Sequence, residues 1–221
     1  QTDGEPIETL APEELTEAVA DYDLFMEAIT AVSPVPIRFD EIAGEAKGYY
    51  HSGDKEIVIQ KGMSESQTIK TAIHETGHAR LHDKDLMAEQ GIEKDRLTKE
   101  VEAESVTYCV CSAFGVDTSE YSLPYIAGWS SGRDMKELKT SMDTIRKTAG
   151  EMIDELSEKL QELFTEKKQL LESEQKEKLI PAMEAAGYHF DELESSDGNL
   201  RFLPDGTHEI GGAWIADSWN D

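Results

Sequence analysis

The sequence predicts an α+β protein in which helices dominate. Residues 64–82 and 94–114 have helix-like apolar patterns, and a longer helical pattern covers residues 134–177. Residues 49–59 favour a β-hairpin, and residues 179–221 contain short apolar runs separated by turns. We therefore expect helices packed on a small antiparallel sheet, then a long C-terminal helix and a small β-rich tail module.

The first half of the chain predicts these elements in order. A helix is expected over residues 12–31, because Pro12 suits a first helical turn and Ser33–Pro36 ends the pattern. Tyr49–His51 and Ile57–Ile59 then form the hairpin around a polar turn. The helices over 64–82 and 94–114 follow, joined by a polar stretch, and Gly115 closes the second.

The second half begins with an aromatic and apolar segment over residues 121–129. The long helix that follows carries an apolar stripe at nearly heptad spacing, which favours core packing over self-association, although both are consistent with the pattern. The tail then predicts a short helix over residues 181–186 and strands over 188–190, 200–203 and 213–215.

Composition excludes several classes of protein. The net charge is −26, from 47 acidic and 21 basic residues, so a nucleic-acid partner is not expected. The acidity indicates solubility or, alternatively, mimicry of DNA phosphates. A run of about 18 apolar residues and a signal peptide are both absent from the sequence, so we expect no membrane partner. Cys109 and Cys111 point to different faces of one helix, so a disulfide between them is not expected, and they predict buried free thiols in a reducing cytoplasm.

The most informative motif is His74-Glu75-Thr76-Gly77-His78, which has the pattern H-E-x-x-H. Ser64 and Gln67 have the spacing of a helix cap, so the motif lies on a helix. Histidines four residues apart share a helical face and can bind one Zn²⁺, while Glu75 can reach a water on that ion. Gly77 is costly inside a helix, and we expect close approach of another element there.

A catalytic zinc site needs a third protein ligand. The second helix carries three candidates, of which Glu100 and Glu104 share one face and Glu102 lies on another. We rank Glu104 first, then Glu100, then Glu102, because the apolar run after Glu104 indicates that the helix is buried from there. A buried carboxylate needs a partner, and a metal is one.

These residue types predict hydrolysis of a peptide bond. Glu75 would take a proton from the attacking water and pass it to the leaving amine. Tyr121, Tyr125 and His82 are the candidate donors to the oxyanion. His82 follows His78 by one helical turn, so it either orients a ligand or lies at the surface.

The stretch Ile69–His82 resembles the zincin-like metallopeptidase domain of ArdC-type antirestriction proteins, including the LtrC-like group of plasmid and conjugative-element proteins. Gly48–Tyr50, Val101–Ser105 and Tyr125–Trp129 are similar too, and a more distant likeness is to ImmA/IrrE peptidases. The resemblance covers residues 35–150. It implies a gluzincin-like fold and a bacterial, cytoplasmic mobile-element protein. The ArdC-like pattern implies Glu104 as third ligand, and the ImmA-like pattern implies Glu102.

The sequence thus divides into four expected parts: an N-terminal helical segment (1–34), a metallopeptidase domain (35–150), a helical arm (151–178) and a tail module (179–221). The chain looks like the peptidase portion of a multidomain protein that acts on a protein or peptide substrate. Two other interpretations remain open. One is a binding module that blocks partners through its acidic surface, and the other is a structural zinc site without turnover.

Overall fold

The computed structural model describes residues 19, 21–119, 122, 135–190, 202–204, 207–210 and 213–216. The chain divides into two compact units, residues 1–161 and 162–221. Its elements confirm the α+β class.

The first unit contains a sheet of three strands, β1 (Ile37–Asp40), β2 (Gly48–His51) and β3 (Glu56–Gln60), in the order β1-β3-β2. The predicted hairpin is confirmed, since β2 and β3 pair antiparallel with Tyr50 opposite Ile57. The expectation of a purely antiparallel sheet is wrong, because β1 runs parallel to β3. This strand was not predicted, because it has only four residues and three of them are exposed.

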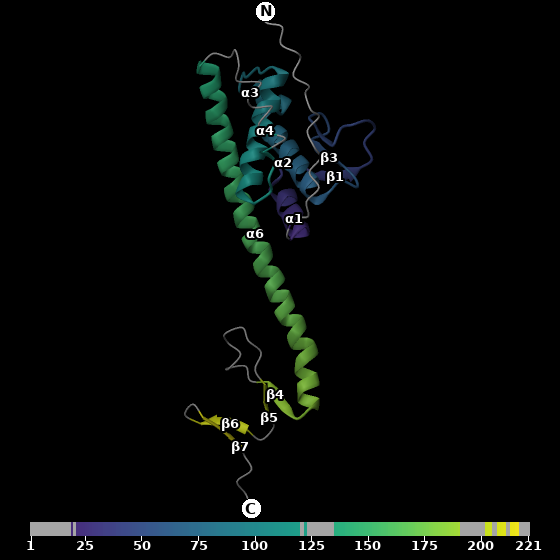
Figure 1. Cartoon of the computed structure of the whole chain (residues 1–221), viewed down its shortest axis with the longest axis vertical. Coiled ribbons are helices and arrows are strands. Elements are labelled where there is room, and N and C mark those ends of the chain that lie inside the picture. The colour runs from purple at the N-terminus through teal and green to yellow at the C-terminus, as the bar shows by residue number, and fades with distance from the viewer. Residues whose placement is uncertain are drawn as a thin grey trace, which may run out of the picture. The chain divides into compact units, whose positions relative to one another are not determined.

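The described helices before residue 119 in this unit (Figure 1) are α1 (Tyr22–Val32), α2 (Glu65–Leu81), α3 (Lys84–Glu89) and α4 (Arg96–Ala113). The cap at Ser64 is confirmed, because its hydroxyl accepts from the Gln67 amide at 3.2 Å. For the helix expected over residues 12–31, the described part contains α1 from Tyr22, preceded by Asp21 with a left-handed backbone (φ 52°). Residues 12–18 and 20 lie outside the described part. Asp83 caps α3, a helix that was not predicted.

The core of this unit forms where α2 lies between the sheet and α4 (Figure 1). The three central residues of β3 are fully buried, and so are apolar residues of α2 and α4. At Gly77, α4 does come close: an added Cβ would lie 3.7 Å from the Cα of Ala103. That is ordinary van der Waals contact, so the expected approach is present but would also admit an alanine.

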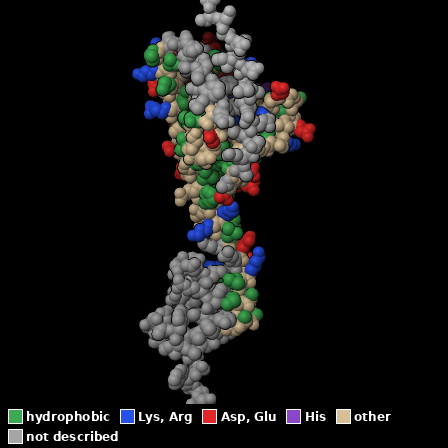
Figure 2. Space-filling model, in the orientation of Figure 1, with side chains coloured by type: hydrophobic (Ala, Val, Ile, Leu, Met, Phe, Trp, Pro, Cys, Tyr) green, Lys and Arg blue, Asp and Glu red, His purple; other side chains and the backbone are tan. Residues whose placement is uncertain are grey.

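Helix α6 (Met135–Ala185) is longer than predicted. It continues through Pro181 to Ala185, so the expected end near residue 177 and the separate short helix over residues 181–186 are wrong. Ala149, Met152 and Leu156 of its first half are buried, which confirms core packing there. Hydrophobic side chains also lie at the surface along the helix (Figure 2), among them Leu170 at 65% exposure. In the described part of the chain, no helix is long and apolar enough to cross a membrane.

The second unit contains the end of α6 and two antiparallel strand pairs. They are β4 (Tyr188–Phe190) with β5 (Phe202–Pro204), and β6 (Thr207–Ile210) with β7 (Ala213–Ala216). Strands were expected at all of these places except β6. Both cysteines are free, as predicted; Cys111 is buried, but Cys109 is exposed, contrary to expectation.

Candidate metal site

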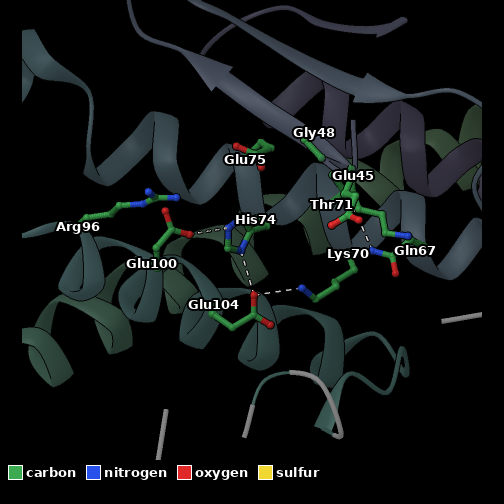
Figure 3. A pocket seen from close by; sticks show the side chains of 12 residues that line it. Glu45, Gly48, Gln67, Lys70, Thr71, His74, Glu75, Arg96, Glu100 and Glu104 are labelled. Atoms are coloured by element: carbon green, nitrogen blue, oxygen red, sulfur yellow. Dashed lines mark hydrogen bonds and ion pairs between the residues drawn. The ribbon is translucent and has the colours of Figure 1, made fainter. Parts of the chain in front are cut away.

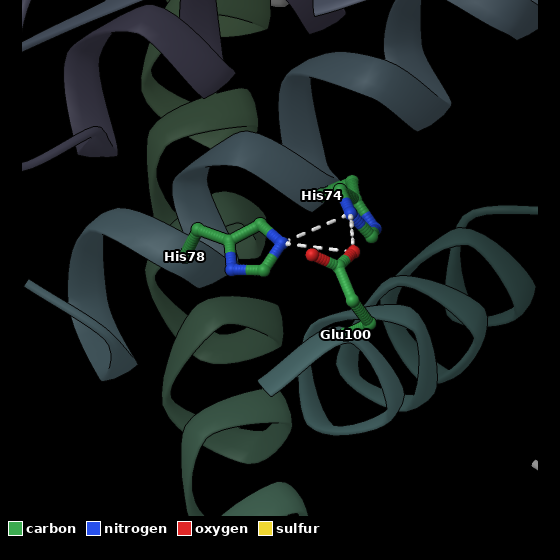
Figure 4. A group of neighbouring side chains, drawn as sticks. All are labelled: His74, His78 and Glu100. Carbon is green, nitrogen blue, oxygen red and sulfur yellow. Dashed lines mark hydrogen bonds and ion pairs between the residues drawn. The ribbon is translucent and has the colours of Figure 1, made fainter. Parts of the chain in front are cut away.

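Helix α2 places the two motif histidines side by side. His74 and His78 are one turn apart on the same face, and their Nε2 atoms lie 3.1 Å from each other (Figure 4). Both rings are mostly buried, at 16% and 14% exposure. The helix can hold polar groups in this interior position because it is covered by the sheet and by α4, which supplies their partners.

Helix α4 supplies a carboxylate to the same point. Glu100 Oε2 lies 3.7 Å from His74 Nε2 and 3.6 Å from His78 Nε2 (Figure 4). A tetrahedral ion with bonds of about 2.0–2.2 Å separates its ligand atoms by about 3.3–3.6 Å. The three separations, 3.1, 3.6 and 3.7 Å, lie close to this range, so these residues form a possible metal site. The two histidines lower the pKa of Glu100, so it is present as a carboxylate.

Glu104, the first choice for third ligand, lies one turn further along α4 and contacts a different atom of the site. Its Oε2 is 3.1 Å from His74 Nδ1 and 3.0 Å from Lys70 Nζ (Figure 3), and its Oε1 accepts from Ser122 at 2.6 Å. Glu104 therefore lies behind the His74 ring, on the side away from His78. Along this contact α4 runs opposite to α2, so Glu100 reaches the histidine pair and Glu104 reaches back toward Lys70.

The charges of this cluster depend on one another. Burial would raise the pKa of Glu104, but His74, Lys70 and Ser122 lower it to about 2. Burial would likewise lower the pKa of His74, but the carboxylates of Glu100 and Glu104 raise it to about 9. Without a metal, His74 thus holds a proton that neutralises excess negative charge. A divalent cation would take the place of that proton.

Glu102 and His82 lie on the other side of the histidine pair. Glu102 is fully buried and contacts His82 rather than either motif histidine. His82 is also buried, so the surface interpretation of this residue is wrong, and it lies against His78 with 3.0 Å between their Nδ1 atoms. The structure therefore places Glu102 away from the point where Glu100 meets the two rings.

Glu75 lies beside a cleft of about 370 Å³ (Figure 3). It is 8% exposed, and among the described residues its carboxylate has no hydrogen-bond partner. Gly48 of β2 packs closely here, because an added Cβ would lie 2.6 Å from Thr71 Cγ2 and 3.4 Å from Glu75 Cγ. The cleft is polar and is lined by Glu45, Ala46, Lys47, Gly48, Gln67, Lys70, Thr71, His74, Glu75, Arg96, Glu100 and Glu104. Tyr121 and Tyr125 lie outside the described residues.

Several contacts of the site were not predicted from the sequence. Lys70 precedes His74 by one turn, so helical spacing alone could have placed it on the site's face. Ser122 and Ser141 could not have been found in this way. They reach Glu104 and Glu102 from 18 and 39 residues away, and no local pattern marks them.

The described residues define an α+β domain with two histidines and one carboxylate that could hold a metal, and part of this domain is similar in sequence to known proteins. Residues 33–125 match the peptidase family described as the IrrE N-terminal-like domain. The chain is 37% identical over 123 residues to the uncharacterized protein pXO2-81 of Bacillus anthracis. The aligned stretch covers 55% of this chain and 20% of that protein. The predicted resemblance to this class of peptidase domain is therefore confirmed.

The structure is also similar to the crystal structure of the antirestriction protein ArdC from the R388 plasmid, described as Mn(II)-bound. The TM-score is 0.39 and the identity 20%, over 72% of this chain and 59% of that one. The chain thus spans only part of the length of each relative.

Proposed function

We propose that this chain carries a metal-dependent peptidase domain. The observation that supports it most is that His74 Nε2, His78 Nε2 and Glu100 Oε2 converge at tetrahedral spacing beside a cleft that also holds Glu75. Imidazole and carboxylate are the ligands of catalytic Zn²⁺ sites, which keep a fourth position open. We therefore move the proposed third ligand from Glu104 to Glu100 and keep Zn²⁺ as the proposed metal.

The proposed chemistry depends on what each residue does. When bound, Zn²⁺ would supply Lewis acidity to the reacting carbonyl and water. Glu75 accepts a proton on its carboxylate from the attacking water and delivers it to the leaving amine. Its small exposure and its lack of a described hydrogen-bond partner leave that carboxylate available for the proton.

The position of β2 supports a peptide as the substrate. This strand is an edge of the described sheet, and its first residue, Gly48, lines the cleft. An edge strand offers backbone N–H and C=O groups to an extended peptide, which adds to the sheet. The close packing of Gly48 on Thr71 and Glu75 would bring such a peptide next to the proposed base.

We place this activity in the bacterial cytoplasm, as one domain of a plasmid or conjugative-element protein that cleaves a host or element protein. The support is the sequence resemblance to ArdC-type and LtrC-like proteins together with the match of residues 33–125 to a peptidase family. Glu75 lines the same cleft as His74 and Glu100, which favours turnover over a purely structural ion.

Replacing Glu75 by glutamine tests the proposal directly. The full chain, loaded with Zn²⁺, is incubated with a peptide library from a digested bacterial proteome, and new termini are identified by mass spectrometry. We expect Glu75→Gln to bind Zn²⁺ like the wild type. Its cleavage rate should fall by about 100-fold or more, the size of effect typical of a lost general base. Glu89→Gln, at an exposed glutamate of α3, is the matched control. Full activity of Glu75→Gln would contradict the mechanism.

The net charge of −26 favours one alternative, a binding module that blocks DNA-binding partners by its acidic surface. Under that function the wild type would cleave no peptide of the library. It would inhibit DNA cleavage by a restriction endonuclease, and Glu75→Gln would inhibit equally well. The same two proteins therefore separate the two functions.

A further inference from the structure

A buried chain of hydrogen bonds leads away from His78. Its Nε2 faces His74 and Glu100, while its Nδ1 lies 3.0 Å from Nδ1 of His82. The other nitrogen of His82, Nε2, lies 3.0 Å from Glu102 Oε2. His82 is 6% exposed and Glu102 is fully buried, so water does not compete for these contacts.

This chain of hydrogen bonds ends at Glu102, which accepts from a charged donor and a hydroxyl donor of two other segments. Lys94, just before α4, donates to Glu102 Oε2 at 2.6 Å. Ser141, in the first half of α6, donates to Glu102 Oε1 at 2.7 Å. Glu102 is thus an ionised acceptor whose position is fixed by two donors besides His82, as a buried carboxylate requires. Helix α6 therefore reaches Glu102 through Ser141.

The connectivity fixes where each proton lies when a metal is bound. A ligating His78 needs a free electron pair on Nε2, so its proton is on Nδ1 and is donated to His82 Nδ1. His82 then carries its own proton on Nε2 and donates it to Glu102. A carboxylate can only accept, so it selects this arrangement over the reverse one, which would place a proton on the metal-facing nitrogen of His78.

We propose that His82 and Glu102 are positioning residues that hold His78 in its metal-binding form, and that α6 supports them through Ser141. This rests on the proposed metal site, which it deepens. His74 has no such chain, because Glu104 Oε2 lies 3.1 Å from its Nδ1 without the alignment of a hydrogen bond. His78 is thus the ligand whose outer nitrogen is linked to a buried carboxylate of α4, through a second imidazole. Such outer contacts fix the tautomer and orientation of ligating histidines.

The competing explanation is that Glu102 only neutralises the buried ammonium of Lys94, with 2.6 Å between the two charged groups. In that case the His82 ring fills space, and replacing it would leave metal affinity unchanged. Zn²⁺ affinity of the full chain, measured by competition with a chromophoric chelator, distinguishes the two. It does not depend on peptidase activity.

We expect His82→Phe to bind Zn²⁺ about 10–100-fold more weakly than the wild type, the usual effect of losing an outer-shell partner. His82→Asn should lose less, because its side-chain oxygen can accept from His78 in place of Nδ1. His51→Phe, at an exposed histidine of β2, is the control for the replacement itself. In the Co²⁺-loaded protein, the visible spectrum of His82→Phe should change while that of His51→Phe should not.

A second pair of variants tests the link to α6 without altering a buried ring. Ser141→Ala should weaken Zn²⁺ binding less than His82→Phe, and Ser157→Ala should leave it unchanged. Ser157 lies on the same helix, but its hydroxyl bonds only to the Ile153 carbonyl at the surface. Unfolding of each metal-free variant is followed by circular dichroism, so that a loss of fold is recognised; if His82→Phe does not fold, the serine pair decides.

The outcomes separate this inference from the function on which it rests. If His82→Phe and Ser141→Ala bind Zn²⁺ with wild-type affinity, the proposed role of the hydrogen bonds from His78 to Glu102 is overturned, but the metal site stands. A wild type that does not bind Zn²⁺ would overturn the proposed function and this inference together. Equal losses in Ser141→Ala and Ser157→Ala would overturn the link to α6.

Discussion

Helix α2 and the second half of α6 differ in which kind of side chain they bury, and their sequences alone do not predict this difference. In α2, buried positions hold polar side chains, whereas exposed positions of α6 hold large apolar ones. The buried polar residues of α2 are Ser66, Gln67, Thr68, Lys70, Thr71, Glu75 and Thr76, and the exposed apolar residues of α6 include Phe164, Leu170 and Leu171. Residue type alone therefore does not identify the face of a helix that packs inward.

The difference follows from where partners are available. A buried polar group is tolerated when it is hydrogen-bonded or paired, and α4 provides such partners for α2, as Glu104 does for Lys70. An exposed apolar side chain has no comparable penalty and is common on protein surfaces. The site thus depends on matched polar pairs, while the stability of the first unit comes from apolar residues such as those of β3.

The same substitution at two leucines of α6 tests how much burial contributes to the free energy of unfolding. Leu156 is fully buried and Leu170 is 65% exposed. We expect Leu156→Ala to lower the free energy of unfolding by about 2–5 kcal/mol, because it leaves a cavity, and Leu170→Ala to change it by less than about 0.5 kcal/mol. Urea unfolding of the full chain gives both values. A large loss in Leu170→Ala would show that this side chain is covered in solution, as self-association of α6 would require.

Glu100 and Glu104 test which carboxylate of α4 meets the metal. Glu100→Ala should weaken Zn²⁺ binding by at least about 100-fold, or about 2.8 kcal/mol, because a ligand is lost. Glu104→Gln should weaken it by only about 10-fold, since that side chain touches His74 from behind. Chelator competition gives both affinities, and Mn²⁺ is measured in parallel because carboxylate ligands also suit it. A larger loss of affinity in Glu104→Gln than in Glu100→Ala would identify Glu104 as the third ligand.

Much of the fold could be predicted because it depends on local patterns. The cap at Ser64 places α2 to within a residue, and the hairpin turn fixes the pairing of β2 with β3. Two histidines four residues apart on a helix must share a face, so their meeting required no further information. The α+β class and the candidate ligands of α2 were therefore accessible from the sequence.

The rest depended on contacts between distant segments. Glu100 and Glu104 share a face of α4, so the choice between them depends on how far α4 is shifted along α2, which no local pattern reports. Ser141 reaches Glu102 across 39 residues. The parallel pairing of β1 depends on a chain path that leaves and returns to the sheet. The long helix was expected to end near residue 177, but it continues through Pro181 to Ala185.

The smallest expected effect concerns a second, partly buried polar cluster around the buried Asp83, which joins the hairpin to α3. Asp83 accepts hydrogen bonds from Lys55 Nζ at 2.5 Å and from the Tyr50 hydroxyl at 2.6 Å. These two donors, Lys55 first, hold the pKa of Asp83 well below its usual range. A lowered folded-state pKa stabilises the protein above the unfolded-state pKa of about 4, and that contribution is lost as the pH falls below this value.

Asp83→Asn should therefore remove a pH-dependent part of the stability. We expect the difference in unfolding free energy between wild type and Asp83→Asn to be constant above about pH 5 and to shrink below about pH 4. Urea unfolding at a series of pH values measures it, with Asp143→Asn, at an exposed position of α6, as the control. Parallel curves for wild type and Asp83→Asn down to pH 3 would mean that these donors do not hold Asp83 in its charged form. Charge interactions of buried polar groups outside the metal site would then not contribute to the free energy of unfolding in this region.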